Sequence, residues 1–256
     1  MVRGLDVFKK YFAAFPDNYV VIGGTACDVI IEGADLIPRA TKDIDIILVV
    51  EALTATFVTQ FWQFIQDGKY ERQEKSEDGR QYYRFMKPED TSFPFQVELF
   101  SRTPDTIDLK EGAHLTPIPV DDDLSSLSAI LMDDNYYNFM IEHSIDEDGL
   151  HRANTEALIC LKAKAYLEIA DRIAKGGTED KKHLKKHKAD VFRMAVMMNE
   201  GEVYELPDPI KEQLRTFMKI AAEDLPDKAI FKEMGLGNVN VKNVYDQLMV
   251  TFQLEA

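Results

Sequence analysis

The sequence has few cysteines, no long apolar run and a deficit of positive charge. Its 256 residues include 2 cysteines, Cys27 and Cys160, which are too few for a disulfide framework. No stretch approaches the ~18 consecutive apolar residues that a membrane-spanning helix needs. The first residues carry charges where a secretion signal needs an apolar segment. We therefore expect a cytoplasmic protein with no membrane partner.

Acidic residues outnumber basic ones, with 45 Asp and Glu against 30 Lys and Arg and a formal net charge of −15. Broad, non-specific binding to nucleic acid needs many cations near phosphates, so this balance argues against it but permits a local basic patch. The hydrophobic content of 45% and the charged content of 29% are ordinary for a globular protein. The length allows one large domain or two smaller ones.

The kind of predicted element changes near residue 150. Before it, strands and helices alternate; after it, long helical patterns follow one another. Strands are predicted at 19–22, 42–50, 81–86 and 95–100, helices at 2–15, 25–31, 54–66, 154–174, 178–199, 210–222 and 241–252, and a hairpin at 127–141. We predict an α+β fold with an α/β domain at 1–150 and a helical domain at 151–256 that contributes to the cleft.

Two aspartates interrupt an apolar strand in the segment from Arg39 to Val50. Side chains alternate along a strand, so Arg39, Thr41, Asp43 and Asp45 are expected on one face. Two carboxylates side by side on a half-buried face favour a bound cation. A polar strand end with a chance Asp-x-Asp spacing is the alternative. The triplet Asp121–Asp123 has no such spacing and is interpreted as a solvated loop.

A glycine pair, Gly23 and Gly24, stands between the first predicted strand and a helix, and Thr25 follows it. Glycine lets a backbone approach a ligand closely, and the start of a helix offers free N–H groups to an anion. A further carboxylate, Glu98, lies within the later apolar strand. By itself Glu98 is better explained as the exposed-face residue of an alternating strand.

The helical half carries a misplaced lysine and a basic run. Lys162 falls inside the apolar stripe of its helix, whereas Lys164 falls on the polar side. Lys162 either extends to the rim of the apolar face or reaches an anion. The run from Lys181 to Arg193 concentrates cations around Asp190 and is either a solvated face or a contact for phosphate or RNA.

Taken together, the Gly-Gly-Thr turn, the Asp-Ile-Asp strand and Glu98 resemble the nucleotidyltransferase superfamily of the polymerase-beta type. Arg39-Ala-Thr-Lys-Asp-Ile-Asp45, the Lys162 segment and Lys185-Lys-His-Lys-Ala-Asp190-Val-Phe-Arg193 are similar to its AbiEii-like toxin group. The resemblance covers roughly residues 19–200. Thr25 stands where many members have serine.

The resemblance implies a nucleotidyltransferase-type mixed sheet with flanking helices. It also implies a Mg²⁺-dependent enzyme that moves a nucleoside monophosphate from an NTP to a hydroxyl or RNA end. Its implied catalytic residues are Asp43, Asp45, Glu98, Lys162 and Asp190; two Mg²⁺ ions would be held by Asp43, Asp45 and Glu98; and Gly23, Gly24, Thr25, Arg39 and Thr41 would bind the nucleotide.

The group further implies a toxin of a toxin–antitoxin or phage-defence system, with an antitoxin protein as partner and tRNA or another polyanion as acceptor near Lys181–Arg193. Two other hypotheses stay open. One is a catalytically inactive relative that binds a nucleotide or a protein. The other is a structural protein whose acids lie on a solvent face.

Overall fold

The computed structural model describes residues 2–75, 82–103, 115–117, 128–178, 180–199 and 201–255. The chain divides into two compact units, Met1–Asp28 with Ala40–Ala153, and Val29–Arg39 with Asn154–Ala256. The loop expected at Asp121–Asp123 lies outside the described residues.

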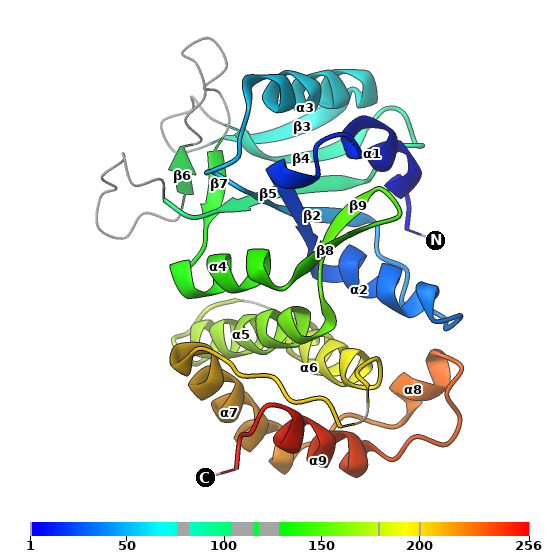
Figure 1. Ribbon diagram of the computed structural model, residues 1–256, viewed down its shortest axis with the longest axis vertical. Helices are drawn as coiled ribbons and strands as arrows, with labels where there is room; N and C mark the ends of the chain where they lie inside the picture. Colours follow the sequence, from blue (N-terminus) through cyan, green and yellow to red (C-terminus); the bar gives the residue numbers. More distant parts are fainter. Residues whose placement is uncertain are drawn as a thin grey trace. The chain divides into compact units, whose positions relative to one another are not determined.

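The first unit combines a mixed, open sheet with flanking helices, so its fold is α+β (Figure 1). Its helices are α1 (Leu5–Phe12), a 3₁₀ turn (Pro16–Asn18), α2 (Gly23–Gly33, which ends in the second unit), α3 (Ala55–Gly68) and α4 (Asp134–Glu142). Its strands are β1 (Tyr19–Ile22), β2 (Asp43–Leu48), β3 (Tyr70–Lys75), β4 (Tyr82–Pro88), β5 (Gln96–Ser101), β6 (Leu115–Pro117), β7 (Ser128–Leu131), β8 (Ser144–Glu147) and β9 (Leu150–Ala153).

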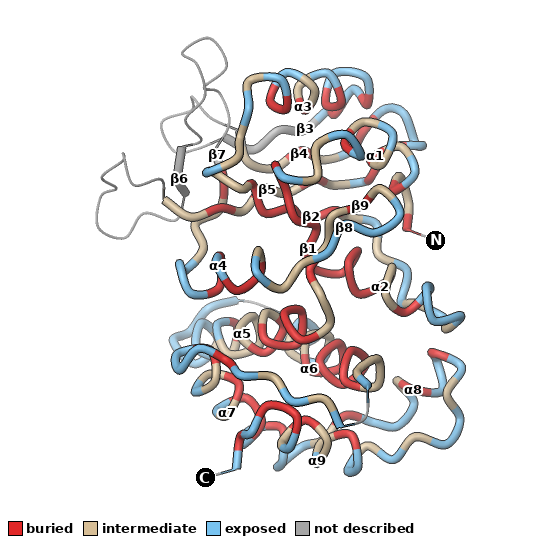
Figure 2. The backbone as a smooth tube through the Cα atoms, in the orientation of Figure 1, coloured by how far each residue is buried: buried red, intermediate tan, exposed pale blue. Residues whose placement is uncertain are grey.

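The strands follow the order β3-β4-β5-β2-β1-β9-β8, and β7 joins β5 and β6 beside this path. The pairs β2–β5, β1–β9 and β5–β7 are parallel, whereas β1–β2, β3–β4, β4–β5, β6–β7 and β8–β9 are antiparallel. The strand with the aspartate pair, β2, therefore lies in the interior of the sheet. Figure 2 shows buried residues along β1 and most of β2, and buried residues alternating with intermediate ones along β5.

One face of the sheet is apolar because alternate side chains on neighbouring strands are in register. Ile44 is opposite Val97, and Ile46 is opposite both Val21 and Leu99. All five are completely buried. Since side chains alternate, the residues between them on β2, Asp43 and Asp45, point to the other face.

Helices α1 and α3 cover the apolar face with a layer of aromatic rings. The Phe12 ring lies 5.2 Å from Phe64 and 6.1 Å from Tyr19, centroid to centroid. Phe61 of α3 meets Phe85 of β4 at 5.5 Å in a T-shaped contact. These large apolar side chains give the first unit its core and leave the aspartate-bearing face for other contacts.

The predicted hairpin at 127–141 is wrong. Strand β7 ends at Leu131, and helix α4 follows it. The Asp133 carboxylate accepts hydrogen bonds from the backbone N–H groups of Asn135 and Tyr136, as the residue that caps the start of a helix commonly does. The acidic cluster that suggested a turn is a helix start.

A hairpin does occur farther along the chain, between β8 and β9. Its turn contains Asp148 and Gly149, whose φ angles are +52° and +73°. Asp-Gly is a frequent pair in turns that need positive φ at both positions. The sequence analysis predicted neither strand and likewise did not predict β3 or the short helix α8.

The second unit consists of α5 (Thr155–Ala174), α6 (Lys182–Ala195), α7 (Asp208–Glu223), α8 (Ala229–Glu233) and α9 (Val241–Thr251), with the segment Val29–Arg39. Helix α5 packs along α6 and α7, and the rings of Tyr166 and Phe217 meet at 5.2 Å. The N–H of Ile37 donates to the carbonyl of Met234, which attaches the early segment to the end of α8. Within the described ranges, none of the helices has the length and apolar character needed to cross a bilayer.

Candidate functional site

The glycine pair lies directly against the residues of the aspartate strand. Gly23 has a φ of +72°, and a Cβ placed there would collide with Oδ2 of Asp45. A Cβ on Gly24 would come within 2.6 Å of Oγ1 of Thr41. The backbone angle favours glycine at Gly23, and at both positions a Cβ would force a neighbouring side chain to move.

Two buried side chains join helix α2 to the chain around the pair. The Thr25 hydroxyl donates a 2.6 Å hydrogen bond to the backbone carbonyl of Asp43, and Thr25 is completely buried. Oδ2 of Asp28 accepts a 2.6 Å hydrogen bond from the N–H of Thr41. These bonds fix the position at which β2 begins relative to the glycine turn.

Four strands place a row of side chains across the face that carries the aspartates. Asp45 of β2 is opposite Ile22 of β1 and Glu98 of β5, and Glu98 is opposite Arg84 of β4. Register partners on adjacent strands project from the same face. The structure thus places the predicted third acid beside the pair, which the sequence could not establish.

Glu98 is bound by an arginine. Nε and Nη2 of Arg84 both contact Oε1 of Glu98, and the Glu98 side chain is only 12% exposed. The part of the chain that the structure describes holds no group of three or more His, Cys, Asp or Glu side chains gathered as metal ligands. Asp43 and Asp45 are half-buried on the same face of β2.

A second cluster forms within the helical unit around Asp190, which is 4% exposed. Oδ1 of Asp190 lies 3.3 Å from Nη1 of Arg193 and 3.5 Å from Nε of Arg39. Oδ2 lies 3.9 Å from Nζ of Lys162, beyond hydrogen-bond range, and finds no hydrogen-bond partner among the described residues. Arg193 also donates to Glu233 at 2.8 Å. The surrounding cations compensate a carboxylate that would be costly to bury alone.

The two lysines on α5 occupy different environments. Lys162 is 5% exposed and faces Asp190. Lys164 pairs with Glu168 one turn along the same helix, at 3.5 Å, and that carboxylate is 53% exposed. The helical wheel correctly identified Lys162 as the lysine on the buried side.

His187 lies one turn before Asp190 on α6. Burial lowers the pKa of its imidazole to about 4, and the charge of Lys162 lowers it further, whereas Asp190 acts in the opposite direction. Its Nδ1 is buried and has no hydrogen-bond partner in the described part of the chain. The imidazole is therefore neutral at pH 7. Sequence analysis overlooked it because a histidine in a lysine-rich run resembles a solvated residue.

Arg39 is not on the strand face where alternation placed it. Strand β2 begins only at Asp43, and Ala40 has a φ of +66°, so the chain is not extended between the two positions. The Arg39 guanidinium instead pairs with Asp190. The prediction that Arg39 shares the face of Asp43 is therefore wrong.

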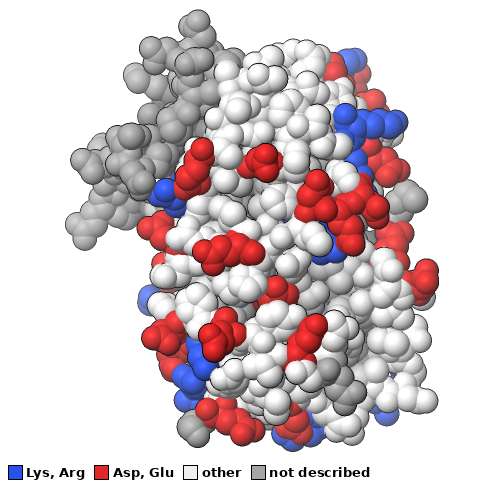
Figure 3. Space-filling model, viewed as in Figure 1, with Lys and Arg blue, Asp and Glu red and all other residues white. Residues whose placement is uncertain are grey.

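Carboxylates already neutralise several cations of the basic run. Lys182 pairs with Asp180 at 2.9 Å, and Lys188 with Asp224 at 2.6 Å. Lys181, just before α6, and Lys185 on α6 are exposed. Figure 3 shows acidic side chains spread over the displayed face, in agreement with the net charge of −15. The positive field expected from this run is thus reduced.

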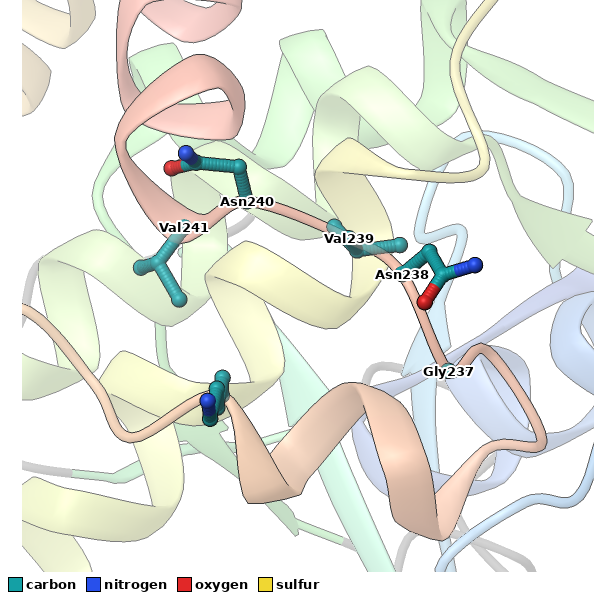
Figure 4. Close-up of a pocket in the computed structure, with 6 residues that line it drawn as sticks. Gly237, Asn238, Val239, Asn240 and Val241 are labelled. Atoms are coloured by element: carbon teal, nitrogen blue, oxygen red, sulfur yellow. The ribbon is translucent and has the colours of Figure 1, made fainter.

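A surface pocket between α8 and α9 is lined by Lys228 and the segment Gly237–Val241 (Figure 4). Asn240 belongs to the helix itself, since its Oδ1 accepts a 2.8 Å hydrogen bond from the N–H of Lys242 at the start of α9. None of the predicted site residues lines this pocket.

The structure brings the predicted residues together in two sets. Gly23, Gly24, Thr25, Thr41, Asp43, Asp45 and Glu98 gather in the first unit, and Arg39, Lys162 and Asp190 in the second. Asp28 and Arg84 were not predicted from the sequence. An acid in the middle of an apolar helix was a signal for Asp28, whereas Arg84 is recognisable only from the strand register. No model of a known protein family and no curated protein matches the chain.

Proposed function

We propose that the protein is a nucleotidyltransferase of the AbiEii-like type, which transfers a nucleoside monophosphate from an NTP to a hydroxyl or RNA-end acceptor with Mg²⁺. The observation that carries the proposal is the contact between the glycine turn and the aspartate strand, where the Asp45 carboxylate lies in the space that a Cβ on Gly23 would take. A turn that approaches a carboxylate pair so closely suits a triphosphate with its metal ion.

The residues of the first unit fit such a metal ion. Mg²⁺ commonly takes one or two protein carboxylates and completes its shell with water and substrate phosphates. Asp43 and Asp45 supply two hard oxygen ligands on one face, and the Asp45 carboxylate lies directly against the backbone of Gly23. When bound, the ion would offset charge on the α-phosphate and on the leaving pyrophosphate.

Thr25 receives a different role from the one implied by the resemblance. Its hydroxyl is bonded to the carbonyl of Asp43 and is completely buried, so it positions the strand. Gly23 and Gly24 provide the close backbone approach, and Thr41 presents a buried hydroxyl beside Gly24.

In the second unit the proposal assigns Lys162 to the negative charge of the triphosphate and Asp190 to the acceptor. A carboxylate oxygen without a hydrogen-bond donor among the described residues is suited to accept one from a substrate hydroxyl. Arg39 and Arg193 pair with Asp190 and hold its carboxylate in place.

Transfer of label tests the proposal. The protein is incubated with α-labelled NTPs, Mg²⁺ and a pool of tRNA or protein acceptors. We expect labelling that EDTA abolishes and that Asp43→Ala and Asp45→Ala each lower by at least about 10²-fold. If both variants transferred as much label as the unaltered protein, the proposal would be excluded. NTP binding by calorimetry without transfer to any acceptor would favour the inactive nucleotide-binding relative instead.

The proposal includes the role of a toxin neutralised by an antitoxin protein. Growth arrest on expression, absent for Asp45→Ala at equal protein level, is the expected result. A neighbouring gene for a small DNA-binding protein that relieves the arrest would support it.

A further inference from the structure

The pairing of Arg84 with Glu98 bears on how many metal ions the protein holds. Glu98 is register partner to both Asp45 and Arg84, so it could turn to either neighbour. The structure shows it with Arg84, through both Nε and Nη2. Both nitrogens meet the same carboxylate oxygen, so the arginine compensates the charge of Glu98 and keeps Oε1 on its own side.

Burial makes this choice consequential. The Glu98 side chain is 12% exposed and that of Arg84 is 31% exposed. Water therefore solvates these two charged groups poorly if they separate. A half-buried carboxylate that leaves its arginine must be compensated by another cation. The Glu98 carboxylate can therefore be compensated either by Arg84 or by a metal ion.

Resting on the proposed function, we infer that Arg84 is a positioning residue that holds Glu98 away from the metal site, so that the nucleotide-free protein binds one divalent cation through Asp43 and Asp45. This differs from a three-carboxylate, two-metal arrangement already formed before the nucleotide binds. It agrees with the absence of a gathered three-ligand group among the described residues.

Binding of Mn²⁺, followed by the loss of the free-ion signal in electron paramagnetic resonance, tests the inference without any turnover. We expect the unaltered protein to bind one Mn²⁺ per chain. Glu98→Gln should change its dissociation constant by less than about 3-fold. Arg84→Met should remove the arginine from Glu98 and either add a second ion or tighten the first by about 10-fold.

The double variant Arg84→Met/Glu98→Gln should return to the behaviour of the unaltered protein, because the gain depends on Glu98. Arg84→Lys keeps a cation beside Glu98 and should bind a single ion, and circular dichroism checks that each variant is folded. If Arg84→Met does not fold, Glu98→Gln alone remains decisive.

Two results would overturn this inference and leave the proposed metal site standing. One is Glu98→Gln weakening Mn²⁺ binding as strongly as Asp45→Asn; the other is a folded Arg84→Met with unchanged number and affinity of ions. Absence of Mn²⁺ binding in the unaltered protein, or binding that Asp43→Asn and Asp45→Asn leave intact, would overturn the proposed metal site as well.

Discussion

The Thr25 hydroxyl donates a 2.6 Å hydrogen bond to the backbone carbonyl of Asp43, linking the start of α2 to the start of β2. Thr25→Val removes the donor while keeping the shape of the side chain. We expect it to lower the free energy of unfolding by about 1–2 kcal/mol and to lower transfer activity. Thr25→Ser keeps the hydroxyl and should retain activity, as measured by chemical denaturation and by label transfer. Equal loss in both variants would mean that packing matters here and the hydrogen bond does not.

The close approach of the glycine turn yields a matched pair of substitutions in one helix. Gly23→Ala would place an alanine at a φ of +72° with a Cβ that collides with Asp45. We therefore expect a loss of about 1–3 kcal/mol in the free energy of unfolding. Gly33→Ala, at the other end of α2, meets nothing within 4 Å and should change stability by at most about 1 kcal/mol. Thermal denaturation of both variants measures the difference, and a neutral Gly23→Ala would refute the close approach.

The two lysines of α5 provide a control within a single helix. Lys162 is buried beside Asp190, whereas Lys164 pairs with a carboxylate that is 53% exposed. We expect Lys162→Met to lower transfer by about 10²-fold and Lys164→Met to leave it within about 2-fold. Steady-state assays with circular dichroism as a folding check decide between them. Similar losses in both variants would remove Lys162 from the proposed chemistry.

The pKa of His187 gives the protein a pH dependence of known sign. The folded state holds the imidazole near pKa 4, below the ordinary value of 6.5, because burial and Lys162 disfavour the cation. The unfolded chain therefore binds the proton more readily, and stability falls as pH drops from 6.5 toward 4, by an amount on the order of 3 kcal/mol.

His187→Gln should remove this part of the pH dependence, as measured by denaturant unfolding across that range. Lys162→Met should raise the pKa of His187, because it deletes a neighbouring cation, and NMR titration of the imidazole reads this directly. An unchanged imidazole titration in Lys162→Met would show that the lysine does not act on His187.

Local patterns were enough to predict most elements. The apolar spacing gave helix α5 and strand β1 with nearly their observed bounds, and the lysine inside the α5 stripe is buried. The wrong predictions fall on short polar residues, which occur both in turns and at helix starts. Asp133 begins a helix where a turn was predicted, and Asp148 with Gly149 forms a turn where only a boundary was predicted.

The site was less predictable because it depends on contacts between distant parts of the chain. The spacing of Asp43 and Asp45 indicates a shared face, but only strand register places Glu98 beside them and Arg84 beside Glu98. Arg39 shows the opposite case. Alternation holds only for extended backbone, and one residue at φ +66° was enough to invalidate it.

The most direct test of the central claim compares NTPs that carry the label on different phosphates. NTP labelled at the α-phosphate and NTP labelled at the γ-phosphate are each incubated with Mg²⁺, the protein and a tRNA pool. We expect label from the α-position alone to enter the acceptor, with one pyrophosphate released per transfer and at least about 10²-fold less of both in Asp45→Asn. Transfer of the γ-label, or α-label transfer that Asp45→Asn leaves unchanged, would contradict nucleotidyl transfer at the aspartate pair.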